Sequence, residues 1–142
     1  MIPNPTLPLL QLTPRPDLGI LVGRWGYQPH PSQLPAAYEE LAVVGLRDKC
    51  RFWLQDIRRR TLNDPHTTHW LLTDYFPEMA ARLGERLYVA YLVSPDLHQL
   101  IITGPEFAPV ASYINKPFAV AFFGDEGEAI GWLTKQQAAP PQ

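Results

Sequence analysis

The sequence predicts an α/β fold, with a mixed five-stranded sheet and helices packed mainly on one face. Three observations lead to this prediction. Residues 87–93 and 118–123 are strand-length runs that are almost wholly apolar, as in strands buried on both faces. After the first 30 residues, segments with helical spacing of apolar residues alternate with strand-like segments. Before them, a proline-rich turn joins two strand-like segments, which predicts an N-terminal hairpin.

The first half of the chain is expected to form this hairpin, a helix and the third strand. Ser32 is a suitable N-cap for the helix, and Pro35 is tolerated in a first helical turn. Leu34, Tyr38 and Leu41 then follow helical spacing on one face. The expected elements are strands over residues 7–12, 18–25 and 51–57, a turn over 13–17, a helix over 33–47 and a loop over 58–63.

The second half is expected to add two buried strands and the remaining helices. Asp64 caps a helix that has Pro65 at its first position. Pro77 lies inside the helical pattern and predicts a kink near residues 73–75, and Gly84 is a good C-terminal stop. The expected elements are strands over 87–93 and 118–123, a helix over 96–102 and a terminal helix from residue 125, with 104–117 unassigned.

Length and composition predict one globular domain. The chain has 142 residues, of which 46% are hydrophobic and 18% charged, so it can bury a single core. The domain is expected over residues 7–135, with a flexible N-terminus at 1–6 and a disordered tail at 136–142. The single cysteine, Cys50, excludes a disulfide within the chain.

Charge and hydropathy argue against several classes of partner. The formal net charge of −2 gives no bulk attraction to nucleic acid or to an anionic membrane. The first residues lack the basic region of a signal peptide, and prolines interrupt their apolar positions. No apolar run approaches the roughly 20 residues that span a bilayer. We therefore expect a cytoplasmic protein with no nucleic-acid partner and no membrane span.

Five segments follow one another in an order typical of a known family. They are Gly23-Arg24-Trp25, Phe52–Arg58, Phe76–Gly84, Tyr88–Pro95, and Phe122-Phe123 with Glu128–Leu133. With these segments the chain resembles, over roughly residues 7–135, the SpoIIAA-like branch of the STAS-like fold, which is related in shape to the CRAL-TRIO lipid-binding domains. It looks most like small stand-alone bacterial proteins of that group. The resemblance implies a compact five-stranded sheet flanked by helices, often a homodimer, and no catalytic apparatus.

The phosphate switch of that group is not expected here. In its anti-sigma-factor antagonists, a serine in an Asp-Ser pair after a central strand accepts phosphate and switches partner binding. This chain has no Asp-Ser pair, and its serines are Ser32, Ser94 and Ser112. Thr61, just after the third strand, is the nearest candidate phospho-acceptor. Glycine-rich phosphate loops of the usual kinds are also missing, and we expect no cofactor.

Basic residues gather around the third strand. Residues 47–60 hold six basic and two acidic side chains, a local charge of +4. Arg58, Arg59 and Arg60 follow a strand end, where ligands often bind in open α/β sheets, and guanidinium groups suit phosphate or carboxylate. Asp56 and Arg58 share one face, so Asp56 either positions Arg58 for a ligand or anchors the strand to its loop. These four residues are the candidate ligand- or partner-binding site; a solvated loop is the alternative.

Two further groups are candidates for chemistry. His66 and His69 lie three residues apart near Asp64 and could hold a metal ion, but they are few ligands, and exposed first-turn polar residues are the simpler interpretation. No metal is expected. Cys50 lies between Lys49 and Arg51, where a lowered pKa would make it reactive; the alternative is a buried, inert thiol.

Three functions remain open at this point. The preferred hypothesis is a non-enzymatic binding or regulatory module that engages a protein partner through the loop carrying Arg58–Arg60. The alternative is a carrier of a small apolar or lipid-like ligand, since the aromatic residues near the two buried strands could line a cavity between sheet and helices. An enzyme would rest only on the closeness in sequence of Asp56, Arg58, His66 and His69.

Overall fold

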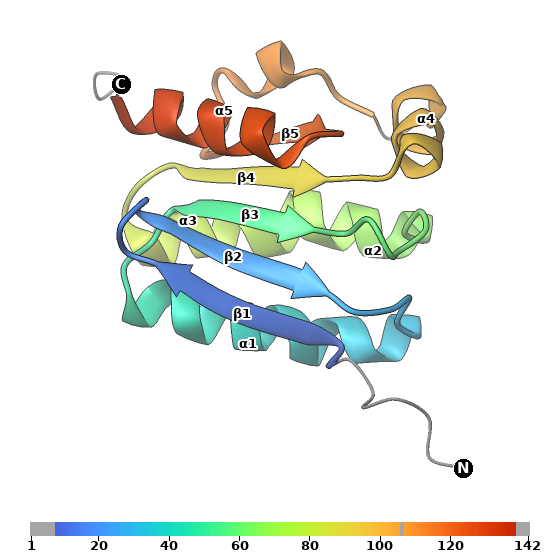
Figure 1. Ribbon diagram of the computed structural model, residues 1–142, viewed down its shortest axis with the longest axis horizontal. Helices are drawn as coiled ribbons and strands as arrows, with labels where there is room; N and C mark the ends of the chain where they lie inside the picture. Colours follow the sequence, from blue (N-terminus) through green and yellow to red (C-terminus); the bar gives the residue numbers. More distant parts are fainter. Residues whose placement is uncertain (1–7, 106, 139–142) are drawn as a thin grey trace.

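The chain forms a mixed sheet whose strands lie in sequence order, β1-β2-β3-β4-β5 (Figure 1). The computed structural model describes residues 8–105 and 107–138. β1 pairs antiparallel with β2, and the pairs from β2 to β5 are all parallel, which confirms the α/β class and the five-stranded mixed sheet. The strands are β1 (Leu10–Arg15), β2 (Ile20–Trp25), β3 (Phe52–Asp56), β4 (Leu87–Leu92) and β5 (Phe118–Phe123).

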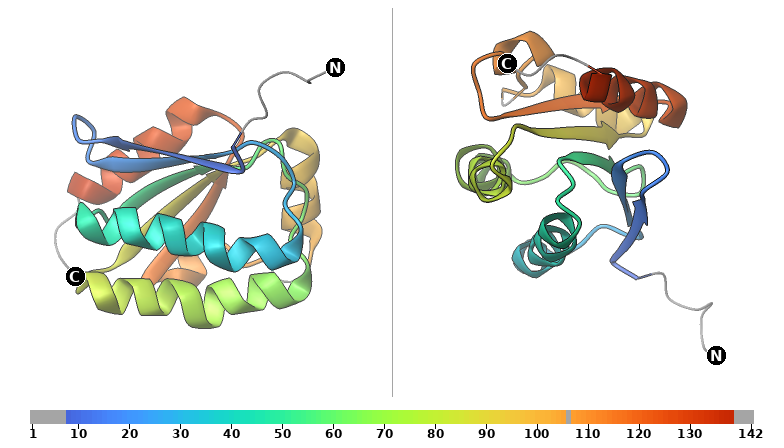
Figure 2. Two further views of the ribbon diagram at one scale, coloured as in Figure 1. Left: turned by 90° about the horizontal axis from the view of Figure 1, so that it is seen from below. Right: turned by 90° about the vertical axis from the view of Figure 1, so that its left-hand side faces the viewer.

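Helices cover both faces of this sheet, α1 and α3 on one side and α5 on the other (Figure 2). The segment between β4 and β5 carries α4 and the 3-10 turn η3. The helical elements are η1 (Pro31–Gln33), α1 (Leu34–Arg47), α2 (Pro65–Trp70), the π-helical η2 (Leu71–Tyr75), α3 (Phe76–Leu83), α4 (Pro95–Thr103), η3 (Val110–Tyr113) and α5 (Glu126–Ala138). No helix in the described ranges combines the length and the apolar character needed to cross a bilayer.

Packing on both faces explains why β4 is apolar throughout. All six of its residues are buried. Tyr88 faces α5, where its ring lies 6.0 Å from that of Trp132, and the neighbouring Tyr91 faces the α1 side. On that side Trp53 of β3 is fully buried beneath Gly45 of α1. A Cβ on Gly45 would lie 2.9 Å from the Trp53 ring, so the helix approaches the sheet closely because this position lacks a side chain.

The first strand of the N-terminal hairpin lies later in the chain than expected. Strand 7–12 and turn 13–17 are wrong in detail, because β1 continues through Pro14 to Arg15 before the chain turns. β1 is an edge strand, and a proline there need not supply a hydrogen bond to a second neighbour. Ser32 is not the N-cap: His30 precedes η1, and its Nδ1 accepts the Ser32 N–H at 3.1 Å.

Where the sequence predicts a kink near residues 73–75, the chain forms the π-helical η2, which follows α2 and leads directly into α3. The Phe76 N–H donates to the Leu71 carbonyl, five residues back, at the end of η2. Proline has no N–H for the carbonyl four residues before it. The Thr73 hydroxyl lies one turn earlier and donates to His69 O at 2.8 Å. The predicted cap at Asp64 is confirmed, as is the stop at Gly84, whose φ is 74°.

The two chain ends were expected to be without regular structure. Residues 1–6 and 139–142 lie outside the described residues. The expected disorder is wrong for 136–138, because α5 extends to Ala138. Gln137 donates through Nε2 to Leu18 O at 2.9 Å and to Gly19 O at 3.2 Å, so this last turn is held against the hairpin.

Candidate ligand-binding site

An ion-pair cluster lies at the carboxyl ends of β2 and β3, on the α5 side of the sheet. Arg24 and Asp56 are register partners, so their side chains share that face. Arg24 Nη1 donates to Asp56 Oδ2 and to Glu126 Oε1, both at 2.9 Å. Arg58 donates to the same Asp56 carboxylate through Nε at 3.0 Å and Nη2 at 2.8 Å. The cluster thus joins β2, the loop after β3 and the start of α5.

Asp56 is the centre of this cluster, with only 11% of its side chain exposed. Burial alone would raise the pKa of Asp56, but hydrogen bonds from the Arg58 side chain and backbone, and then from Arg24, outweigh it and hold the pKa below its usual value. A polar groove over the cluster is lined also by Arg59, which is exposed. The carboxylates of Asp56 and Glu126 take up Nη1 of Arg24, and Asp56 takes up Nε and Nη2 of Arg58, so the ion pairs hold β2, β3 and α5 together.

Arg60 lies on the opposite side of the sheet from Arg58. Its N–H donates to Ile57 O at 3.0 Å, and this tight turn reverses the chain. The side chain is 4% exposed, and its guanidinium carbon lies 4.5 Å from the centre of the Trp25 ring, which faces α1. Nη2 donates to Asn63 Oδ1, whereas Nε is buried and has no hydrogen-bond partner among the described residues. Arg58 and Arg60, which were expected to belong to one binding site, therefore lie on opposite sides of the sheet.

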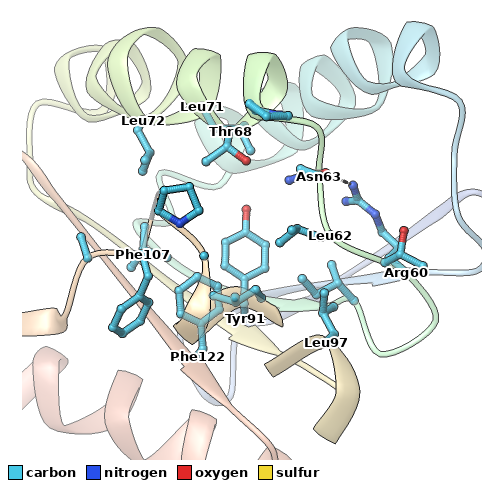
Figure 3. A pocket seen from close by; sticks show the side chains of 18 of the residues that line it. Arg60, Leu62, Asn63, Thr68, Leu71, Leu72, Tyr91, Leu97, Phe107 and Phe122 are labelled. Carbon is cyan, nitrogen blue, oxygen red and sulfur yellow. Dashed lines mark hydrogen bonds between the residues drawn. The ribbon is translucent and has the colours of Figure 1, made fainter. Parts of the chain in front are cut away.

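Arg60 lines a largely apolar cavity of about 180 Å³ on the α1 and α3 side of the sheet. The cavity lies between the ends of β4 and β5, the helical segment α2–η2–α3, α4 and the segment that follows α4. In Figure 3 Tyr91 points into this space, with Phe107 and Phe122 on one side and Arg60 with Asn63 on another. Its apolar walls include Ile57, Leu62, Pro65, Leu71, Leu72, Phe76, Leu97, Ile101, Pro105, Phe107, Ala108, Val120 and Phe122.

Hydrogen bonds link Tyr91, which lines the cavity, to Tyr38 and Tyr75 in the core behind it. The hydroxyls of Tyr91 and Tyr38 lie 2.9 Å apart, and the Tyr75 hydroxyl donates to the Tyr38 carbonyl at 2.6 Å. Burial raises the pKa of Tyr91 well above its usual value, and Tyr38 adds to the rise. Burial also raises the pKa of Tyr75. The raised pKa values keep the Tyr91 and Tyr75 hydroxyls protonated at neutral pH, so both can donate hydrogen bonds.

The sequence did not predict which residues line the cavity. Its walls come from segments up to 65 residues apart, from Ile57 to Phe122, and several belong to 104–117, which showed no readable pattern. The available signal was the pair of aromatic-rich apolar strands. The η2 segment adds Leu71 and Leu72 to the wall, whereas its Thr73 and Asp74 are exposed.

The remaining candidates lie elsewhere or serve the fold. Thr61 is exposed at the cavity rim, and its N–H donates to Gln28 Oε1 at 2.7 Å. His66 and His69 are exposed on α2, and within the described ranges no three His, Cys, Asp or Glu side chains lie close enough to hold a metal ion. The thiol of Cys50 donates to Phe52 O at 3.3 Å. Burial raises the pKa of this thiol, whereas the adjacent Lys49 and Arg51 suggested a lowered pKa.

The enzyme hypothesis gains nothing from this placement. Asp56 and Arg58 bind each other in the ion-pair cluster, and no hydrogen bond joins either of them to His66 or His69. Asp56 and Arg58 thus lie in the ion-pair cluster, whereas His66 and His69 are exposed on α2. Comparison with protein-family models and with curated proteins finds no match to this chain.

Proposed function

We propose that this chain is a non-enzymatic binding module that holds a small apolar ligand in the cavity between its sheet and helices. The observation that carries the proposal is the cavity itself, about 180 Å³ with predominantly apolar walls. An apolar cavity of about 150 Å³ in a protein core stays dry and binds benzene. The space in this chain is therefore large enough for a single ring or a short branched hydrocarbon, and too small for a long lipid chain.

The position of the cavity supports the same proposal. It lies beside the carboxyl ends of β3, β4 and β5, where ligands bind in open α/β sheets. Tyr91 and Phe122 form its floor with rings 5.6 Å apart and nearly parallel. The STAS-like assignment, the homodimer that the resemblance implies and a cytoplasmic location belong to this proposal too. The observation in favour of that assignment is the five-stranded sheet flanked by helices, in which β1 is antiparallel to β2 and the strands from β2 to β5 are parallel.

A protein partner at the ion-pair groove is the second candidate function. The observation in its favour is that the exposed Arg59 lies in the same groove as Asp56 and Arg58. The internal pairing of Asp56 with Arg58 weakens this candidate, because few free charges remain for a partner. Capture of a partner that is lost with Arg59→Ala and kept with Arg47→Ala, another exposed arginine outside the groove, would support it.

Binding of toluene, observed by methyl NMR, tests the cavity. Toluene should shift the methyl signals of Leu62, Leu72 and Ile101, which line the cavity, and should raise the melting temperature because it binds the folded state. Ala108→Phe places a ring in the cavity wall and should abolish these shifts. Ala111→Phe adds the same ring at an exposed position outside the wall and is the matched control.

The proposal would be contradicted by wild-type protein whose lining methyl signals do not respond to saturating toluene. It would also be contradicted if Ala108→Phe and Ala111→Phe bound toluene equally well. Both variants should be compared with wild type by circular dichroism first, so that a loss of fold is not read as a filled cavity.

A further inference from the structure

The cavity contains one feature that an apolar ligand does not explain, the buried guanidinium of Arg60. Among the described residues that line the cavity, Arg60 is the only arginine, and none is a lysine, histidine, aspartate or glutamate. It is 4% exposed. Moving a charge out of water is costly unless the charge is paired. The structure gives this side chain no such pair: within residues 8–105 and 107–138, no carboxylate oxygen lies within 4.0 Å of it.

The contacts that Arg60 does make are neutral ones. Asn63 accepts one Nη2 hydrogen bond, and the Trp25 ring faces the guanidinium at 4.5 Å. The Nε–H, which together with Nη2 forms the edge that carboxylates bind in bidentate pairs, has no partner among the described residues. Figure 3 shows Arg60 and Asn63 beside the space into which Tyr91 points.

We propose that the natural ligand of this cavity is a small monocarboxylate with a single ring or a short branched chain, and that Arg60 binds its carboxylate. This inference rests on the proposed function and names the chemical class of the ligand. The apolar walls hold the hydrocarbon part of the ligand. The carboxylate supplies a counter-charge that no described residue provides at Arg60, and the Tyr91 hydroxyl, now bonded to Tyr38, is a further donor inside the cavity.

The composition of the walls favours a carboxylate over a phosphate. Phosphate carries more charge and presents several acceptor oxygens, and it is usually met by several cations or a row of backbone N–H groups. Here one guanidinium faces walls that are predominantly leucine, isoleucine, proline and phenylalanine. A volume of about 180 Å³ also fits a compact ligand better than a nucleotide or a long-chain fatty acid. One planar anionic group on a compact apolar body fits both the charge and the space.

The test compares benzoate with its neutral analogues benzyl alcohol and toluene, by calorimetric titration of the full chain at pH 7. Benzoate should bind at least roughly tenfold more tightly than benzyl alcohol, as expected for a charge-assisted hydrogen bond. Arg60→Met keeps an unbranched side chain about as long as the aliphatic part of arginine but removes the charged guanidinium, and it should lose this preference while still binding toluene. Arg59→Met removes the neighbouring exposed arginine and should leave all three affinities unchanged.

The outcomes separate the two proposals. Toluene binding without a preference for benzoate in wild-type protein overturns the carboxylate and leaves the cavity proposal standing. A preference that survives Arg60→Met assigns the anion to another group and overturns the role of Arg60. If neither toluene nor benzoate binds, the proposed function itself fails. The comparison of benzoate with benzyl alcohol in wild-type protein tests the preference for a carboxylate even if Arg60→Met does not fold. An intermolecular NOE between benzoate and the Tyr91 ring shows that benzoate binds in the cavity.

Discussion

Replacing Gly23 by alanine tests the packing that sets the position of Arg60. Gly23 of β2 is the register partner of Gln55 of β3, and an added Cβ would lie 2.8 Å from Gln55 Nε2 and 3.0 Å from Oε1. Gln55 is fully buried, and its Oε1 accepts the Trp25 Nε1–H at 3.0 Å. Arg60 lies over the Trp25 ring, so a shift of the Gln55 amide that moves Trp25 also changes the contact that positions the Arg60 guanidinium.

Three terms set the expected size of the effect. Overpacking a filled core costs about 1–3 kcal/mol, and leaving the buried indole N–H without its acceptor costs about 1–3 kcal/mol. Alanine recovers about 0.5–1 kcal/mol over glycine inside a strand. Gly23→Ala should therefore lower the free energy of unfolding by about 3 kcal/mol. When Gln55 is already alanine, the methyl group has room, and the same change should be neutral or stabilise by up to about 1 kcal/mol.

The assay is a double-mutant cycle in urea, followed by the fluorescence of the four tryptophans. The free energies are comparable only if the slope against urea stays constant across the four proteins. Gly131→Ala is the control, since Gly131 lies exposed in α5 with nothing within 4 Å of an added Cβ, and it should stabilise by about 1 kcal/mol. Additivity of Gly23→Ala and Gln55→Ala within about 0.5 kcal/mol would refute the reasoning.

Two further predictions concern titratable groups. Asp56→Asn should lower the free energy of unfolding at pH 7 by about 1–2 kcal/mol, by removing charge-assisted hydrogen bonds. The pKa of Asp56 is lower in the folded state than in the unfolded state. The stability that Asp56 contributes is therefore complete above the unfolded-state pKa of about 4 and is lost as the pH falls through the folded-state pKa. The free energies of unfolding of variant and wild type should converge in urea titrations at acid pH, and a difference that widens there would contradict this. Cys50, whose pKa burial raises, should react with iodoacetamide at pH 8 more slowly than free cysteine, measured by intact mass, and a faster reaction would revive a reactive thiol.

The elements that the sequence predicted best are those in which one local signal decides the structure. Strand 118–123 was expected at the bounds that β5 has, because both faces of the strand are covered and its residues are apolar without a break. Asp64 before Pro65 left one plausible helix start, and Gly84 one plausible stop. In each case the local preference agrees with the tertiary environment, so no long-range information was needed.

The errors arose where a distant part of the chain decides a local structure. Pro14 is a turn residue by local preference, but the edge position of β1 makes a proline acceptable in the strand. The arginine run appeared to be one charged loop, because no pattern in the sequence shows that the chain reverses between Ile57 and Arg60. The cavity depends on the placement of α4 and of 104–117 relative to β4 and β5, which periodicity does not report.

The same turn decides how the arginine run has to be tested. Arg58 lies with Asp56 on the α5 side of the sheet, Arg59 is exposed, and Arg60 lies against Trp25 on the other side. Replacing all three at once would break the ion-pair cluster, remove a surface charge and take the cation from the cavity, so a loss of binding would have three causes. Single replacements separate these causes, because Arg58 and Arg60 act on opposite faces and share no contact. A difference between those two variants is therefore what assigns an anionic ligand to one face of the sheet.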